Sequence, residues 1–295
     1  MSSGGMSYHV TRSLLPAAVC LSFLSVTTAA ELEFAMLAVS AENFAKPHDI
    51  VLSPDGVHLF VADNENNRIA VLDGMTLAEV GAFGHGELAS PHDVVFDSEG
   101  RLLVADTHNH RIAIYIVDGV DGRLAGSLKG RVRSPEGVGV DASGRVFATG
   151  AGSGNLVVFD DGEVVAEIGG LSSPHDVEFD LSGRAWVADA SNDRVVRLNA
   201  ALEIDLTLSG DPYGFDGPRY MDFDADGRLY VADKYSNQIK IIAADGSLLQ
   251  VLGADRAGKG AGLFRRPEGV EIRGPDVWIA DTYNDRIVRY RVSVP

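Results

Sequence analysis

The sequence contains a single cysteine, Cys20, among 295 residues. This residue lies inside an apolar stretch and is followed by further apolar residues, so it does not occupy the cleavage point that a lipid anchor requires. We therefore expect no lipid anchor. Without the N-terminal segment the chain has no thiol, which excludes disulfide bonds and cysteine-ligated metal sites.

An apolar run long enough to cross a bilayer is also lacking at the N-terminus. The stretch LLPAAVCLSFLSV at residues 14–26 is shorter than the ~20 residues that a transmembrane helix needs. Arg12 precedes it, and small residues lead to Glu31, which is the order of a secretory signal peptide; the alternative is a buried N-terminal helix. We predict a signal peptide at residues 1–30, one mature domain at residues 31–295, a secreted or periplasmic location, and no membrane insertion after cleavage.

Basic residues are scarce relative to acidic ones. The chain has 25 Lys and Arg against 42 Asp and Glu, which gives a formal net charge of −17. A surface of this charge repels phosphate backbones, so we expect no nucleic-acid partner. Glycine, by contrast, is abundant at 33 residues, as a fold with many tight turns requires.

Six internal repeats make up most of the sequence. Each begins with a proline and a short β-prone run, which a glycine-containing turn follows. In most repeats a second run ends in Val-Ala-Asp or a close variant, and a loop then leads to a third and a fourth run. The prolines stand 39 to 49 residues apart, at positions 47, 91, 135, 174, 218 and 267. Four antiparallel strands in about 40–50 residues are typical of a β-propeller blade.

The sixth repeat stops after its third strand, near the C-terminus. Residues 32–40 form a strand-like run that precedes the first repeat. Pairing this run with the last blade supplies the missing strand and covers an edge that would otherwise invite aggregation. The sequence therefore predicts an all-β fold, a six-bladed β-propeller whose ring is closed by the N-terminal strand.

The last repeat resembles a known motif, the NHL repeat. It shows Gly258, Phe264, Pro-Glu-Gly-Val at 267–270, Asp281 and Arg286 in the order of that motif. The resemblance extends over roughly residues 46–292 and implies the propeller fold. It does not imply an activity, because propellers host many unrelated functions.

The aspartates of the Val-Ala-Asp runs and the arginines after them recur around the ring. We expect them to be structural, with Asp bonded to backbone or to Arg so that each loop is fixed. The third repeat has Gly150 in place of this Asp, in a loop of small residues. That loop is either simply flexible or leaves room for a ligand.

The residue after each repeat proline varies around the ring. Because the innermost strand of each blade lines the central channel, we expect these six side chains to face one another at the channel mouth. They are His48, His92, Glu136, His175, Arg219 and Glu268.

Alternate blades suggest two sets of three facing residues. His92, His175 and Glu268 form a candidate metal site, since two or three His with a carboxylate are the ligands of catalytic zinc. His48, Glu136 and Arg219 include a cation and suit an anionic substrate group better. The alternative is that the histidines are structural and bond to neighbouring blades.

The Pro-His-Asp motif, an Asp-Gly turn and a strand ending in Asp are similar to the peptidyl-α-hydroxyglycine α-amidating lyases. The resemblance implies zinc on His92, His175 and His48, and calcium on one of three Asp residues. It also implies a tyrosine base, for which Tyr235 and Tyr283 hold the matching place. Arg219 is the candidate channel arginine, although it does not match the arginine position of that family. The calcium candidates are Asp49, Asp93 and Asp176.

Two functions follow from these observations. The first is a metal-dependent carbon–nitrogen lyase, acting on a small molecule or peptide at the channel mouth with Tyr235 or Tyr283 as base. The second is a non-catalytic extracytoplasmic scaffold that binds a ligand or a protein. Because a closed ring needs no partner, we expect a monomer.

Overall fold

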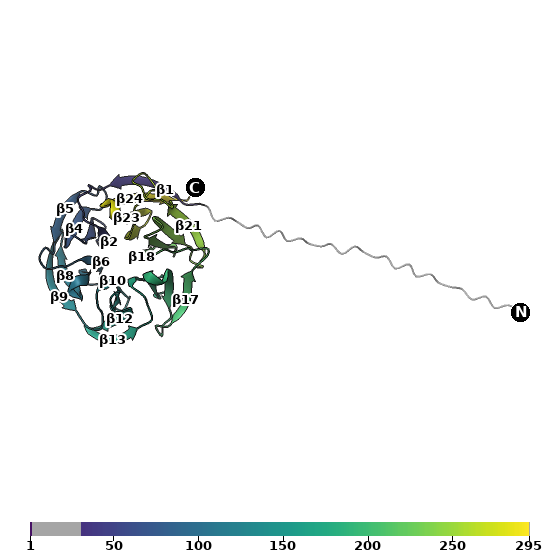
Figure 1. Cartoon of the computed structure of the whole chain (residues 1–295), viewed down its shortest axis with the longest axis horizontal. Helices are drawn as coiled ribbons and strands as arrows, with labels where there is room; N and C mark the ends of the chain where they lie inside the picture. Colours follow the sequence, from purple (N-terminus) through teal and green to yellow (C-terminus); the bar gives the residue numbers. More distant parts are fainter. Residues whose placement is uncertain (2–30, 295) are drawn as a thin grey trace. The chain divides into compact units, whose positions relative to one another are not determined.

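The computed structural model describes residues 1 and 31–294, which include six four-stranded antiparallel sheets arranged as blades around a central channel (Figure 1). The prediction of a six-bladed propeller is confirmed. The predicted signal peptide lies outside the described residues, apart from Met1. Within the described residues no helix is long and apolar enough to span a membrane.

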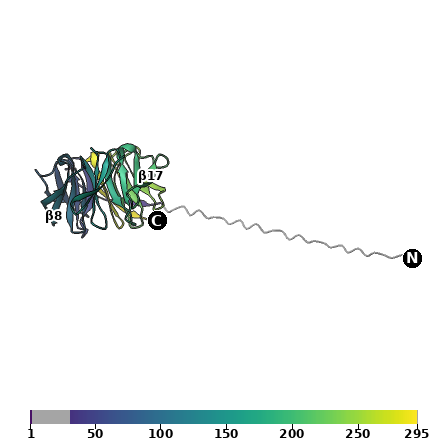
Figure 2. The same ribbon diagram turned by 90° about the horizontal axis from the view of Figure 1, so that it is seen from below.

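Each blade begins at the channel and ends at the rim of the ring, as the inner strand β2 (Pro47–Leu52) and outer strand β5 (Glu79–Phe83) show in blade one (Figure 1). The strands run between the two faces of the ring (Figure 2). The other strands of blades one to three are β3 (His58–Asp63), β4 (Arg68–Asp73), β6 (Pro91–Phe96), β7 (Arg101–Asp106), β8 (Arg111–Asp118), β9 (Asp121–Leu128), β10 (Pro135–Val140), β11 (Val146–Gly150), β12 (Asn155–Asp160) and β13 (Glu163–Ile168).

Blades four to six repeat this arrangement. Their strands are β14 (Pro174–Phe179), β15 (Ala185–Asp189), β16 (Arg194–Leu198), β17 (Ile204–Ser209), β18 (Pro218–Phe223), β19 (Leu229–Asp233), β20 (Gln238–Ile242), β21 (Leu248–Gly253), β22 (Val270–Arg273), β23 (Asp276–Asp281), β24 (Arg286–Ser293) and β1 (Glu33–Val39). Short 3-10 turns follow the second strand of three blades: η1 (Thr107–Asn109), η2 (Ala190–Asn192) and η3 (Thr282–Asn284).

The ring closes where β1 pairs antiparallel with β24, as predicted. Ser40 locks the end of this pairing, because its backbone N–H donates to the carbonyl of Ile287 and its hydroxyl accepts from the Ile287 N–H, both at 2.9 Å. The backbone of Leu32 forms two hydrogen bonds with the side-chain amide of Gln250, at 2.7 and 2.8 Å. The N-terminal strand is therefore tied to blade five as well as to blade six.

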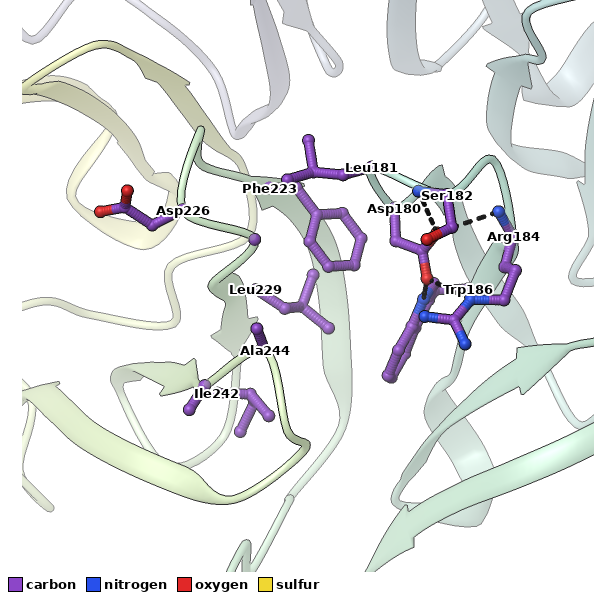
Figure 3. Close-up of a pocket in the computed structure, with 12 residues that line it drawn as sticks. Asp180, Leu181, Ser182, Arg184, Trp186, Phe223, Asp226, Leu229, Ile242 and Ala244 are labelled. Atoms are coloured by element: carbon purple, nitrogen blue, oxygen red, sulfur yellow. Dashed lines mark hydrogen bonds and ion pairs between the residues drawn. The ribbon is translucent and has the colours of Figure 1, made fainter.

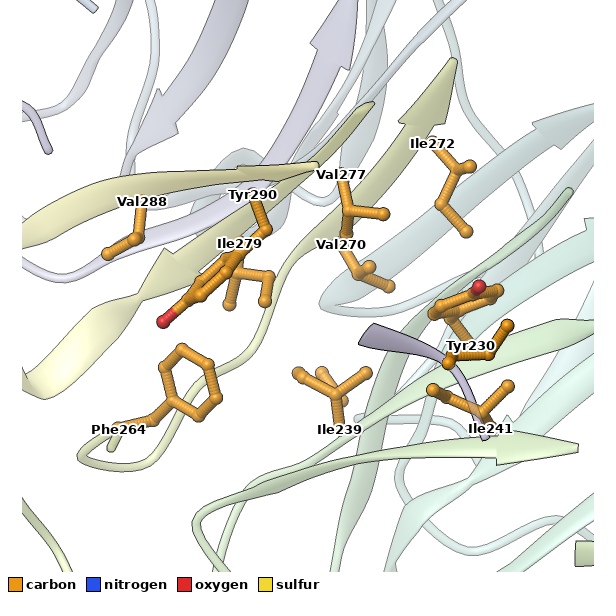
Figure 4. Close-up of a cluster of buried hydrophobic side chains, with 12 residues drawn as sticks. Tyr230, Ile239, Ile241, Phe264, Val270, Ile272, Val277, Ile279, Val288 and Tyr290 are labelled. Atoms are coloured by element: carbon orange, nitrogen blue, oxygen red, sulfur yellow. The ribbon is translucent and has the colours of Figure 1, made fainter. Parts of the chain in front are cut away.

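The hydrophobic core lies between the blades. Between blades five and six, Tyr230 and Ile241 pack against Val277, Ile279 and Tyr290 (Figure 4). These side chains are almost fully buried, and burying each contributes roughly 1.5–3 kcal/mol. The alternating apolar residues of each inner and middle strand thus hold the six inner strands around the channel.

The repeated aspartates are structural, as expected. In blade six, Oδ1 of Asp281 accepts from the backbone N–H of Arg265 at 2.7 Å, and Oδ2 accepts from Asn284 and from Nε of Arg286, both at 2.8 Å. In blade three, which lacks this Asp, Ser153 and Asn155 stand close to Gly150, so that a Cβ there would meet their oxygens at 2.2 and 2.5 Å. That loop is filled by its own side chains.

Candidate functional site

The six residues that follow the repeat prolines do gather at one end of the channel, and their contacts run between neighbouring blades. The rings of His48 and His92 lie 4.3 Å apart, and Nδ1 of His48 is 3.4 Å from Oε2 of Glu268. Glu136 and His175 form an ion pair. These contacts join adjacent blades, whereas the sequence suggested triads from alternate blades.

Glu268 is the most deeply buried member of this ring, with no exposed surface. Two cations face its carboxylate: Nζ of Lys234 lies 2.7 Å from Oε1, and Nε of Arg219 lies 3.7 Å from Oε2. Burial alone would raise the pKa of Glu268, but His48, Lys234 and Arg219 outweigh it and lower the pKa to about 2. Glu268 therefore stays ionised at any physiological pH.

Sequence reasoning missed Lys234. It directly follows the repeated Asp of blade five, at a position where blades one, two, four and six have uncharged residues. Its departure from the repeat was the available signal. In blades one, two, four and six the residues at that position are Asn64, Thr107, Ala190 and Thr282.

The histidines are held in defined orientations. Nδ1 of His92 lies 2.9 Å from the carbonyl oxygen of Ser90, and Nδ1 of His175 lies 2.8 Å from that of Ser173. Nδ1 of His92 also lies 3.0 Å from the amide nitrogen of Asn64 and 2.8 Å from Oγ1 of Thr107. Nδ1 of His175 lies 3.3 Å from Nη1 of Arg219, and its Nε2 faces Glu136. Burial lowers the pKa of His92, and it lowers that of His48 to about 3, so both rings are neutral at pH 7.

The fit of a metal ion to these residues is mixed. A histidine whose Nδ1 is anchored on a carbonyl has the orientation of a metal ligand. However, Glu268 is paired with two cations and Nε2 of His175 with Glu136. In the part of the chain that the structure describes, no three His, Cys, Asp or Glu side chains are placed so that they could hold a metal ion.

The three aspartates considered for calcium lie deeper in the channel and are buried. Two of them connect blades: Oδ2 of Asp93 accepts from the backbone N–H of Val138 at 2.6 Å, and Oδ2 of Asp176 from that of Met221 at 2.7 Å. Burial raises the pKa of all three, that of Asp93 to about 7, and Asp93 raises the pKa of Asp49 further.

Further acids share this part of the channel and were not foreseen from the sequence. Burial also raises the pKa of Glu178, Asp222 and Glu271, and the charge of Asp222 raises the pKa of Glu178 and Glu271 further. We call the channel carboxylates Asp49, Asp93, Asp176, Glu178, Asp222 and Glu271. They lie on inner strands, whose alternation places every second side chain toward the channel.

The two tyrosines predicted as bases lie on loops at the mouth. The hydroxyl of Tyr235 is 3.5 Å from Nη2 of Arg219, and Nζ of Lys234 lies 5.6 Å from the Tyr235 ring and 5.4 Å from the Tyr283 ring. Arg266 covers both rings, at 5.5 Å from Tyr235 and 4.9 Å from Tyr283. The structure thus brings Tyr235 to Arg219, whereas the Tyr283 ring contacts Lys234 and Arg266.

A separate cavity of about 260 Å³ lies between blades four and five (Figure 3). It is lined by the turns that follow β14 and β18. Leu181 in the first turn, Trp186 on β15 and Phe223 on β18 form its apolar wall. Those turns are at the opposite end of the inner strands from the repeat prolines. None of the predicted site residues lines this cavity.

The fold defines a class: the chain is a six-bladed β-propeller. The NHL repeat model matches residues 44–72 and 88–115. Among solved structures, a streptogramin B lyase is similar at 14% identity, with a TM-score of 0.63, covering 89% of this chain and 98% of that one.

A second solved structure is an auxiliary nutrient binding protein from Bacteroides ovatus. It is also 14% identical, has a TM-score of 0.68, and covers 90% of this chain and 77% of its own. A virginiamycin B lyase from Staphylococcus aureus matches at 14% identity and a TM-score of 0.61, over 88% of this chain and 99% of that one. At this level of identity the likeness concerns the fold alone.

Proposed function

We propose that this protein is an exported ligand-binding propeller, which recognises a small molecule or peptide at the mouth of its channel through fixed charges. The observation that supports the proposal most is the buried Glu268 with Lys234 and Arg219 around it. Nδ1 of His48 and Nε of Arg219 are also buried and form no hydrogen bond within the described chain. Buried polar atoms of this kind are rare and cost free energy unless a partner satisfies them.

The protonation states favour binding over proton transfer. A general acid or base works best with a pKa near the working pH. Here the pKa of Glu268 is about 2 and that of His48 about 3. Burial would raise the pKa of Glu136, but His175, with His92 and His48, lowers it below its usual range. These groups keep one charge state across the physiological range, which suits recognition.

A second candidate is the metal-dependent lyase. It is favoured by the anchored Nδ1 atoms of His92 and His175, which are oriented as metal ligands are. His48, His92 and His175 would hold zinc, and the metal would supply Lewis-acid polarisation of a substrate oxygen. Tyr235 would then hold or move a proton next to Arg219. Calcium on Asp49, Asp93 or Asp176 belongs to the same hypothesis.

Elemental analysis and binding assays separate the two candidates. The protein, purified without a His tag and dialysed against zinc, is analysed for bound metal beside the variant His92→Ala/His175→Ala. About one zinc per chain, lost in the variant while the fold persists, would support the lyase and justify assays with hydroxyglycine peptides. The binding propeller would be supported by two results together. The parent binds no zinc, and it binds a small molecule or peptide at least tenfold more tightly than Arg219→Ala or Glu268→Gln does.

A further inference from the structure

The channel mouth is not equally charged around the ring. The residue before each repeat proline is small in blades two to five, namely Ser90, Ser134, Ser173 and Gly217, but it is Arg266 in blade six and Lys46 in blade one. The second residue after the repeated Asp is Tyr235 in blade five and Tyr283 in blade six, whereas the other blades have Glu65, His108, Gly152 and Ser191. Departures from a repeat are where function is expected, since the fold needs only what all blades share.

These departures meet in one place. Within blade six, the Tyr283 N–H donates to the Arg265 carbonyl at 3.0 Å, and the Arg266 N–H donates to Oδ1 of Asn237 in the blade-five loop at 2.9 Å. The N–H of Lys46 in blade one donates to Oδ1 of Asp285 in blade six at 3.1 Å. Nζ of Lys46 and Cζ of Arg266 each lie 4.9 Å from the centre of the Tyr283 ring. We call Lys46, Arg219, Lys234, Tyr235, Arg266 and Tyr283 the cation–tyrosine sector.

The sector has more cations than its own carboxylates neutralise. Lys234 and Arg219 share Glu268, and Lys46 pairs with Asp285 at 3.1 Å. Arg266 is exposed and forms no ion pair within the described part of the chain, although the net charge of the whole sequence is −17. The Tyr235 ring is 45% exposed and offers a flat apolar surface beside these charges.

We propose that the cation–tyrosine sector is the docking subsite for an anionic group, a carboxylate or a phosphate, on the ligand. This inference rests on the proposed function, because the sector borders the channel mouth through Arg219 and Lys234. Guanidinium and ammonium groups arranged around a point bind such oxyanions, and Arg does so with paired N–H donors. An acidic chain that keeps one cationic sector also steers anions toward it and away from the rest of its surface.

The chain offers a matched control for the test. Arg265 is adjacent to Arg266, is also exposed, and makes no cation–π contact with either tyrosine ring within the described structure. The probes are phenyl phosphate and benzoate, with benzyl alcohol as the neutral and benzylamine as the cationic counterpart. Binding is measured by calorimetry at two salt concentrations for the parent, Lys46→Ala/Arg266→Ala and Arg265→Ala.

We expect the two anions to bind, and to bind more weakly at higher salt because charges exposed to solvent are screened. The double variant should lose at least tenfold in affinity and Arg265→Ala less than twofold. Equal losses in both variants would mean that only overall charge matters and would overturn the inference. Binding of the neutral or cationic probe alone would overturn the anionic subsite while the channel-mouth function stands. If no probe of any charge binds, both are rejected.

Discussion

The hydroxyl of Tyr220 donates a hydrogen bond of 3.0 Å to the backbone carbonyl oxygen of Glu136, 84 residues earlier in the chain. Tyr220 lies on β18 of blade five and Glu136 on β10 of blade three, so the side chain crosses the channel between alternate blades. Burial raises the pKa of this hydroxyl, and the charges of Asp93, Glu136 and Glu268 raise it further. Tyr220 is therefore near both the charged ring at the mouth and the channel carboxylates.

Tyr220→Phe should remove this bond and little else, because the ring stays buried at 1% exposure. The expected loss in the free energy of unfolding is about 1 kcal/mol, measured by urea denaturation. Amide hydrogen exchange in β10 should accelerate in this variant. In the control Tyr115→Phe, which removes a bond to Glu87 at 3.0 Å, the amides of β10 should not change. Unchanged stability and exchange in Tyr220→Phe would show that the crossing contributes nothing.

The repeated aspartates should matter far more than surface acids. Asp281→Ala leaves three donors without an acceptor in a site with no exposed surface, and we expect a loss of roughly 3–5 kcal/mol. Asp226→Ala removes an exposed partner of Arg228 and should cost less than about 0.5 kcal/mol. Thermal and urea unfolding of both variants check the difference. Similar losses for the two variants would contradict the structural role.

Much of this arrangement could be predicted from the sequence, because each blade repeats the same local pattern. Proline starts, glycine turns and the Asp at the end of the second strand located the blades, and the incomplete sixth repeat indicated the closure by β1. The six residues at the mouth were found in the same way. Their pairing was not, since an argument from alternate blades cannot decide which side chains touch.

Two residues show why the site itself required the structure. Lys234 lies on a loop and does not follow a repeat proline, yet its long side chain reaches Glu268. Tyr220 occupies the place of the channel Asp in blade five, and only its length and direction make it cross to blade three. Both are side-chain geometries between strands far apart in sequence, which periodicity does not encode.

The channel carboxylates predict an unusual pH dependence. Burial raises the pKa of Asp222 to about 7, although backbone N–H groups of Ile272 and Phe223 bind it and Arg273 lies near; Asp224 raises it further. Unfolded Asp titrates near 4, so between about pH 4 and 7 the unfolded chain releases a proton that the folded chain keeps. The folded state is therefore favoured at the acidic end of this window, and its stability falls as pH rises through 7.

We expect Asp222 to contribute more to the free energy of unfolding at pH 5 than at pH 8, by on the order of 1–4 kcal/mol. Asp222→Asn keeps an acceptor for Ile272 and should flatten this dependence, whereas Asp226→Asn should not. Four other groups at the mouth act in the opposite sense: the lowered pKa values of His48 and His92 favour the folded state as pH rises to about 6.5, and those of Glu136 and Glu268 do so below about pH 4.5. The test is therefore the difference between the parent and Asp222→Asn, and an identical pH dependence of stability in the two would contradict the raised pKa of Asp222.

The ion pair of Lys234 and Glu268 allows a direct test of whether the buried charges at the channel mouth depend on one another. Lys234→Met keeps the volume of the side chain but leaves a carboxylate with no exposed surface beside Arg219 and His48 alone. Because breaking a buried pair leaves an uncompensated charge, we expect a loss of about 3–5 kcal/mol. Because Lys234 is one of the groups that lower the pKa of Glu268, this pKa should rise in the variant.

The double variant Lys234→Met/Glu268→Gln removes the stranded charge and should recover most of that loss. A double-mutant cycle built with Glu268→Gln measures the coupling directly, and residues in contact commonly couple by 0.5–3 kcal/mol. If Glu268→Gln alone stabilises the protein while it weakens ligand binding at the channel mouth, the charges at the mouth are held for recognition at the expense of stability. If the effects of the two single changes are additive, Lys234 and Glu268 are not coupled. The proposal that fixed charges define this site is then rejected.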